Sequence, residues 1–339
     1  MKIVGLILFV VCNLQLHAQR FSTPNSYFNF IRLEKENVSK SISNYVLNLS
    51  NISSADEVIN SKKILITVIQ KSKAKVVALK NGFNGDLDFQ NAFVDYLNST
   101  EKLVKNETIT KSNFKNIADF NYDEMKKYLN EQKNIQVEVK NQAAKLNQIE
   151  REFAEKYKLS LKITENDLSK KMSTALAVFE HHSALYLIYF KSNIAHYNYM
   201  IAVNKKDITA IKTTSKILNE FTIEGLNEIN TMLAYENDES LLKMTKEVLE
   251  YDKQETQSFT TFLLSYLDES SAFASAKKQI DSANDADKIE KFNNLVAKMN
   301  ANIKEFNVKN AEIRTTQKIL LNSWNITAER FLKTHIPKN

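Results

Sequence analysis

The chain has little glycine and almost no proline: of its 339 residues, four are glycine and two are proline. Pro24 and Pro337 lie near the two ends, and only three glycines, Gly82, Gly85 and Gly225, follow the first eighteen residues. These residue types end helices and form tight turns, so the sequence between the ends has few positions at which a helix must stop. It therefore predicts an all-α protein of a few long helices joined by short turns.

Cysteine is also nearly absent, and the single one, Cys12, lies in an N-terminal segment with the form of a secretory signal. A basic start is followed by an apolar run over residues 3–12 and a small-residue cleavage site ending at Ala18. The alternative is a lipoprotein signal with Cys12 lipidated, but residues 9–11 lack the small side chains expected before such a cysteine. We expect residues 1–18 to be a signal peptide. The mature chain is then exported, to the periplasm, the cell surface or the medium, and has no disulfide.

No later segment is apolar enough to predict a membrane span, because the longest candidate, residues 183–190, is far short of the roughly 18 residues required. The formal net charge is +6, and nearly all of the positive charge comes from lysine. These lysines alternate with acidic residues along the whole chain, as on solvated helix faces. Nucleic-acid sites instead gather Arg, Lys and aromatic residues, so we expect no nucleic-acid partner.

Capping and turn residues divide the first half into helices. Thr23-Pro24 predicts a first helix reaching about residue 49, and residues 53–57 begin a second that reaches about residue 80. The sequence 81–86 predicts the clearest turn, in which Gly82 and Gly85 supply left-handed conformations and Asp86 caps the next helix. A third helix then reaches about residue 111, and a fourth spans 121–157.

The second half repeats this pattern with a shift of 152 residues. The shift pairs Ile42 with Ile194, and the turn residues Gly85 and Asp86 with Asn237 and Asp238. For the last helix the shift becomes 164, which places extra residues in a polar loop over 270–285. Seven-residue apolar repeats in the final helix of each half are typical of helical bundles. We therefore predict two tandem antiparallel bundles of about four long helices each, residues 19–162 and 163–339, related by internal duplication.

Common catalytic and metal motifs are absent from the sequence. None of the histidines after residue 18 has an acidic residue three positions earlier, as di-iron bundles require, and no His-Glu-x-x-His zinc motif is present. A Gly-x-Ser-x-Gly elbow and a phosphate-binding glycine loop are missing as well. We expect no metal, no cofactor and no catalytic residues.

One stripe of polar and aromatic residues is unusual. His182, Tyr189 and His196 recur every seven residues, with Tyr186 and Asn193 beside them. One interpretation is a ligand-binding groove or a pH-sensitive contact; the other is a face that packs on neighbouring helices with its polar atoms hydrogen-bonded. On either interpretation, we expect the core face of this helix to lie beside the stripe. The expected core positions are Leu187, Phe190, Ile194, Tyr197 and Ile201.

The turn over residues 85–89, followed by Ala92 and Tyr96, resembles a turn in uncharacterised helical surface or exported proteins of bacteria. The resemblance covers about 80 residues. It implies an envelope or extracellular location and no known catalytic residues.

Two functions follow as expectations. The first is an exported, non-enzymatic helical scaffold or adhesion-type interaction protein with an unknown protein or surface partner. The second is a small-ligand-binding protein with a cavity in or between the bundles. An enzyme of unfamiliar type stays open, because catalytic groups can be far apart in sequence. Trp324, the only tryptophan, is expected in the core or as an anchor of the last helix.

Overall fold

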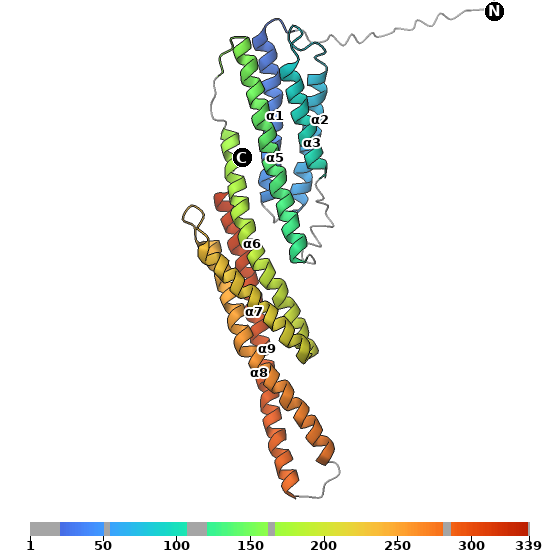
Figure 1. Cartoon of the computed structure of the whole chain (residues 1–339), viewed down its shortest axis with the longest axis vertical. Helices are drawn as coiled ribbons and strands as arrows, with labels where there is room; N and C mark the ends of the chain where they lie inside the picture. The colour runs from blue at the N-terminus through green and yellow to red at the C-terminus, as the bar shows by residue number, and fades with distance from the viewer. Residues whose placement is uncertain (1–20, 51–54, 107–120, 162–166, 281–285, 338–339) are drawn as a thin grey trace, which may run out of the picture. The chain divides into compact units, whose positions relative to one another are not determined.

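The computed structural model describes residues 21–50, 55–106, 121–161, 167–280 and 286–337 (Figure 1). In these ranges all repetitive secondary structure is helical, which confirms the all-α prediction. The predicted signal peptide, the end of the third helix and residues 163–166 lie outside the described residues. The helices are α1 (Pro24–Ser50), α2 (Ala55–Val77), α3 (Asp88–Asn106), α5 (Tyr122–Lys156), α6 (Asp167–Lys205), α7 (Ile208–Thr231), α8 (Ser240–Ile280) and α9 (Ala286–His335).

The chain divides into two compact units. Unit 1 comprises Met1–Tyr45, Ile59–Glu107 and Ile135–Leu168, and unit 2 comprises Val46–Val58, Thr108–Asn134 and Ser169–Asn339. Helix α5 therefore contributes its first third to unit 2 and the remainder to unit 1. Two segments of the first half, Val46–Val58 and Thr108–Asn134, thus belong to unit 2. The predicted domains differ from these units because they divide the chain at a single position, after residue 162. The internal duplication stays a prediction.

Local signals start several of the helices. At the start of α5 the Asn121 side chain accepts a hydrogen bond from the Glu124 backbone N–H at 3.0 Å, and the Glu124 carboxylate accepts one from the Asn121 N–H at 3.3 Å. This reciprocal pair is a capping box. Asp207 caps α7 by accepting from the Ala210 N–H at 3.0 Å. Across the described residues, no helix has an apolar stretch long enough to cross a membrane.

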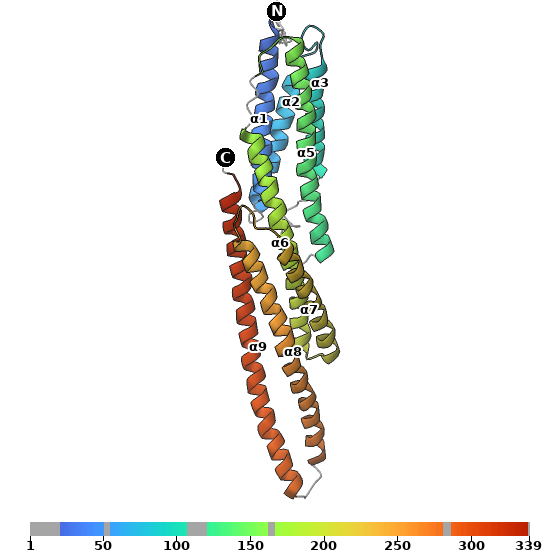
Figure 2. The ribbon, with the colours of Figure 1, turned by 60° about the vertical axis from the view of Figure 1, so that its left-hand side comes forward.

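Unit 1 is built around aromatic side chains. The ring centroids of Phe28 (α1), Phe89 (α3) and Phe153 (α5) lie 5.5 to 5.9 Å from one another, and all three are buried. Figures 1 and 2 show α1, α2 and α3 side by side with the later part of α5. Glu34 is buried among them and accepts hydrogen bonds from Ser72 at 2.8 Å and Lys75 at 2.6 Å. A buried carboxylate here is thus paired, as its desolvation requires.

Unit 2 packs α8 against both α7 and α9, with α6 completing its core. Trp324 of α9 is buried and stacks on Tyr189 of α6 with 4.1 Å between ring centroids. Its indole N–H donates to the Thr245 hydroxyl of α8 at 2.9 Å. The predicted core role of Trp324 is therefore confirmed.

The predicted core face of α6 is right in part: Phe190 is buried, Leu187 and Ile194 pack against the same cluster, and Ile201 is half-buried. Tyr197, placed in the core by the sequence pattern, is 66% exposed, whereas His182, Tyr189, His196 and Tyr199 are buried. Apolar residues occupy nearly the whole circumference of this helix, so periodicity alone does not select a face. The positions of α8 and α9 select it.

The two predicted turns have the same local structure. In the first, Phe83 pairs with Asp86 as an antiparallel bridge across Asn84 and Gly85; in the second, Tyr235 pairs with Asp238 across Glu236 and Asn237. The two residues between each bridged pair have positive φ angles: 52° and 87° in the first turn, and 47° and 67° in the second. Gly82 also has a positive φ, of 55°. Each aspartate accepts a hydrogen bond from the backbone N–H two residues later, so each turn leads into its helix in the same way.

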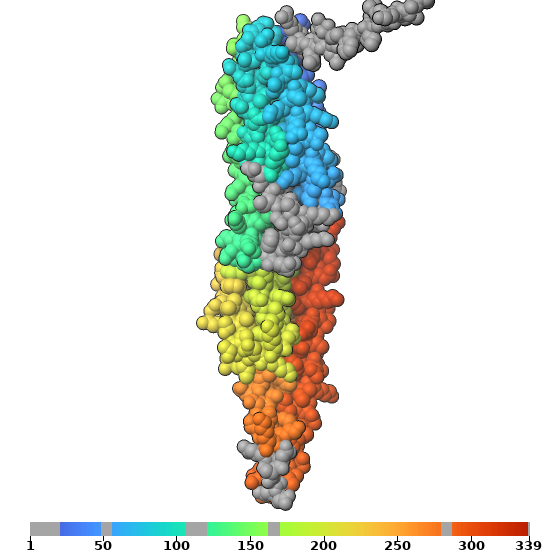
Figure 3. Space-filling model, turned by 90° about the vertical axis from the view of Figure 1, so that its right-hand side faces the viewer, coloured from blue at the N-terminus to red at the C-terminus, as the bar shows by residue number. Residues whose placement is uncertain are grey.

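The predicted loop over residues 270–285 is wrong in its first part, because α8 continues to Ile280. This stretch contains no glycine or proline, and Phe273 stacks on Phe292 of α9 with ring centroids 5.5 Å apart. The two helices extend beyond the turn between α6 and α7 as a hairpin (Figures 1 and 2). In Figure 3 the coloured atoms at this end of unit 2 belong to the orange and red segments of α8 and α9. We call residues 268–280 and 286–298 the arm.

Candidate functional site

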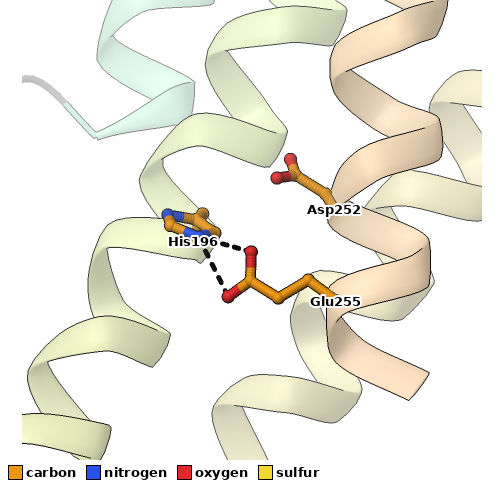
Figure 4. A group of neighbouring side chains, drawn as sticks. All are labelled: His196, Asp252 and Glu255. Carbon is orange, nitrogen blue, oxygen red and sulfur yellow. Dashed lines mark hydrogen bonds and ion pairs between the residues drawn. The ribbon is translucent and has the colours of Figure 1, made fainter. Parts of the chain in front are cut away.

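A buried group of three titratable side chains lies between α6 and α8 in unit 2. His196 comes from α6, and Asp252 and Glu255 come from α8 (Figure 4). The spacing of three residues places both carboxylates on the same face of α8. One potential ligand atom from each side chain lies within 4.8 Å of the other two, and all three residues are buried.

The hydrogen bonds of this group are unevenly distributed. His196 Nε2 lies 3.0 Å from Oε2 and 3.3 Å from Oε1 of Glu255. The Ser192 hydroxyl donates to Oδ2 of Asp252 at 2.5 Å, but Oδ1 of Asp252 has no hydrogen-bond partner. The amide of Gln317 of α9 lies close enough to Asp252 to act on the carboxylate as a hydrogen-bond donor that lowers its pKa, but the two groups do not reach good hydrogen-bond geometry. In this core, Asp252 can therefore accept a further hydrogen bond, and the Gln317 amide can donate one.

Burial and mutual charge determine the protonation of the group. Burial raises the pKa of Asp252 to about 6, although the charge of His196 and the Ser192 hydrogen bond act in the opposite direction. Burial alone would lower the pKa of His196, but its hydrogen bond and charge interaction with Glu255 outweigh this effect and raise the pKa. The arrangement therefore favours an imidazolium paired with Glu255, next to a carboxyl group that holds a proton more readily than usual.

The other residues of the predicted stripe are placed differently. The rings of His182, Tyr186 and Tyr189 surround Trp324, with centroids 6.0, 5.7 and 4.1 Å from it. Burial, with a smaller contribution from His181, lowers the pKa of His182 to about 4, and its Nδ1 has no hydrogen-bond partner. Asn193 is half-buried. The structure thus separates the stripe into an aromatic cluster, in which His182 is neutral, and His196, which pairs with Glu255.

Sequence reasoning missed Asp252, Glu255 and Gln317, because they lie at least 56 residues from His196 along the chain. A signal was present in α8. Thr245, Val248, Leu249, Phe259 and Leu263 are buried at helical spacings, and Asp252 and Glu255 fall in the same register. Charged residues at core positions of an amphipathic helix are rare unless they are paired. Two acidic residues in the apolar register of α8 are therefore a sequence signal for a buried polar site.

A second histidine takes part in the turn of unit 2. His335, near the end of α9, lies 2.9 Å from Asp238 through Nε2 and 3.5 Å from Glu236 through Nδ1. In unit 1, Asp86 occupies the same turn position and accepts from Lys156 at 2.8 Å and from Tyr157 at 3.0 Å, near the end of α5. Each turn aspartate therefore anchors the end of the last helix of its half, which indicates a structural role for both.

An imidazole and two carboxylates in a dry core can hold a proton, pair as ions or bind a divalent cation. Comparisons of the chain with protein-family models, with curated proteins and with solved structures find no match.

Proposed function

We propose that this protein is an exported, non-enzymatic helical scaffold that contacts a partner protein through the arm of α8 and α9. The observation that carries the proposal is the arm's lack of a core. Where side chains are described in residues 268–278 and 287–298, none is buried. The export signal expected from residues 1–18 supports the proposed location.

The arm nevertheless carries large apolar side chains. Phe273 and Phe292 cover one another, but Ile289 is 46% exposed and Leu295 is 39% exposed. Two helices packed only on each other remove little apolar surface from water, and helix propensity alone adds little stability to an isolated helix. A partner that covers these residues would stabilise the arm by the same apolar burial that holds the rest of unit 2 together.

Charged substitutions test the contact. The double variant Ile289→Glu/Leu295→Glu changes the arm, and Ile64→Glu/Ile223→Glu is the matched control on α2 and α7, with exposures of 46% and 40%. A partner is first identified by crosslinking the chain in the cell that exports it, and its affinity is then measured with the two purified proteins. We expect at least tenfold weaker binding for the arm variant and unchanged binding for the control. Equal affinity of the arm variant and wild type, with both folded by circular dichroism, would contradict the proposal.

A further inference from the structure

We propose that His196, Asp252 and Glu255 form a binding site for one divalent transition-metal ion of the Zn²⁺ class. This site is distinct from the arm and does not depend on the proposed scaffold function. His196 would bind through a ring nitrogen, and each carboxylate would supply one oxygen.

The geometry is close to that of a bound ion. Zn²⁺ binds imidazole nitrogen and carboxylate oxygen at roughly 2.0–2.2 Å, so the ligand atoms of a tetrahedral site lie about 3.3 to 3.6 Å from one another. The separations here are 3.0 Å between His196 Nε2 and Glu255 Oε2 and no more than 4.8 Å within the set. Binding therefore requires the more widely separated atoms to move closer by about 1 Å, a displacement within reach of side-chain rotation. Because all three residues lie in the interior of long helices, the site is already preorganised.

Unpartnered polar atoms point to a missing ligand. Oδ1 of Asp252, a residue with 0% exposure, has no hydrogen-bond partner, which leaves a buried acceptor unsatisfied. Such a group costs free energy in a dry core and calls for a specific explanation. A cation bound by Asp252 would satisfy it. The amide of the buried Gln317 lies near the Asp252 carboxylate, and it can donate to that carboxylate or to a metal-bound water.

The charges match a dication. Once His196 gives up its proton and Asp252 is ionised, the two carboxylates and the neutral imidazole carry a formal charge of −2, which one divalent ion neutralises; binding of the ion therefore releases protons. Lys and Arg are absent from the hydrogen bonds and ion pairs that the structure has at Asp252 and Glu255, so among these partners only His196 can supply positive charge in the metal-free protein.

The donor set also narrows the choice of metal. One imidazole and two carboxylates, without sulfur, suit Zn²⁺ and neighbouring first-row ions. Mg²⁺ and Ca²⁺ prefer oxygen ligands alone, and Mg²⁺ usually keeps several waters, for which a buried site has little room. Three protein ligands leave a fourth tetrahedral position open for water.

The test uses the mature chain, residues 19–339, without a histidine tag and after treatment with a chelator. Titration with ZnCl₂ is followed by calorimetry, and native mass spectrometry gives the number of ions bound. We expect one ion per chain and a melting temperature that rises with the Zn²⁺ concentration, because the ion binds the folded state. Mg²⁺ at the same concentrations should produce neither effect.

Variants locate the ion. Asp252→Asn and Glu255→Gln keep the shape of each side chain and should each weaken Zn²⁺ binding at least tenfold. Glu34→Gln changes the buried carboxylate of unit 1, and His335→Gln changes the histidine of the turn; both should bind like wild type. The arm variant should also bind Zn²⁺ normally, so failure of the metal site and failure of the scaffold function are distinguishable. Absence of a 1:1 complex in wild type would overturn the proposal without any variant, and so would full binding by both carboxylate variants.

Discussion

Gly225 of α7 lies directly against Ile188 of α6: a Cβ placed on Gly225 would lie 2.8 Å from the Cγ2 atom of Ile188. The same Cβ would lie 3.0 Å from the nearer Leu249 side-chain methyl, on α8. Gly225 has a helical backbone, so its role is to let three helices approach one another. Leu249 lies about one helical turn from Asp252, so this contact borders the His196 group.

Gly225→Ala should therefore destabilise unit 2. The gain in helix propensity is about 1 kcal/mol, but overpacking against a β-branched side chain costs about 1–3 kcal/mol. We expect a net loss of about 1 kcal/mol in unfolding free energy, measured by urea denaturation. In an Ile188→Ala background the closer of the two contacts is removed and only the Leu249 methyl remains near, so the same substitution should cost less stability than in wild type. Equal effects in both backgrounds would contradict the close approach.

Thr245→Val tests the hydrogen bond to Trp324. Valine keeps the shape of threonine, so the loss comes from leaving the buried indole N–H without an acceptor. We expect a loss of about 1–3 kcal/mol in unfolding free energy. Thr213→Val is the control: its exposed hydroxyl bonds only to its own helix, at the Thr209 carbonyl, and its loss should change stability by less than about 0.5 kcal/mol.

Asp252→Asn should stabilise the metal-free protein at neutral pH. In the folded state the pKa of Asp252 is about 6, above its ordinary value of 3.8. The folded state therefore binds the proton more tightly, and wild-type stability falls as pH rises from about 4 to 6. Asparagine does not titrate, so the advantage of the variant should grow over this range by up to roughly 3 kcal/mol. The measurement is urea unfolding at several pH values with a chelator present. A difference between the two proteins that is constant with pH would refute the raised pKa.

His182→Leu should have the opposite pH dependence. The folded pKa of His182 is about 4, below its ordinary value of 6.5, so the unfolded state binds the proton more tightly. Wild type is therefore fully stabilised by this effect above about pH 6.5 and loses stability as pH falls toward 4. Leucine does not titrate, so stability of the variant relative to wild type should rise as the solution is acidified, by up to roughly 3 kcal/mol. Parallel unfolding curves over this range would show that His182 titrates normally.

The long helices, several helix starts and the two turns could be predicted from the sequence because they depend on local chemistry. Scarcity of glycine and proline specified long helices, and Asn121 and Asp86 marked helix starts because their side chains accept backbone hydrogen bonds within a few residues. The sequence also predicted Asn237 as a left-handed turn residue, because the backbone preference of asparagine depends on that residue alone; its φ is 67°. Such interactions are readable along the chain because both partners are close in sequence.

Only the tertiary structure decided which side of α6 faces inward and what His196 meets there. Helix α6 is apolar on most sides, so its sequence is compatible with several orientations, and packing against α8 and α9 selected the one that buries His182 and His196. The length of α8 was likewise decided by its contact with α9, where Phe273 meets Phe292. Asp252 and Glu255 come within reach of His196 because α6 and α8 pack together. They follow His196 by 56 and 59 positions in the sequence, and no local pattern encodes a contact over such a separation.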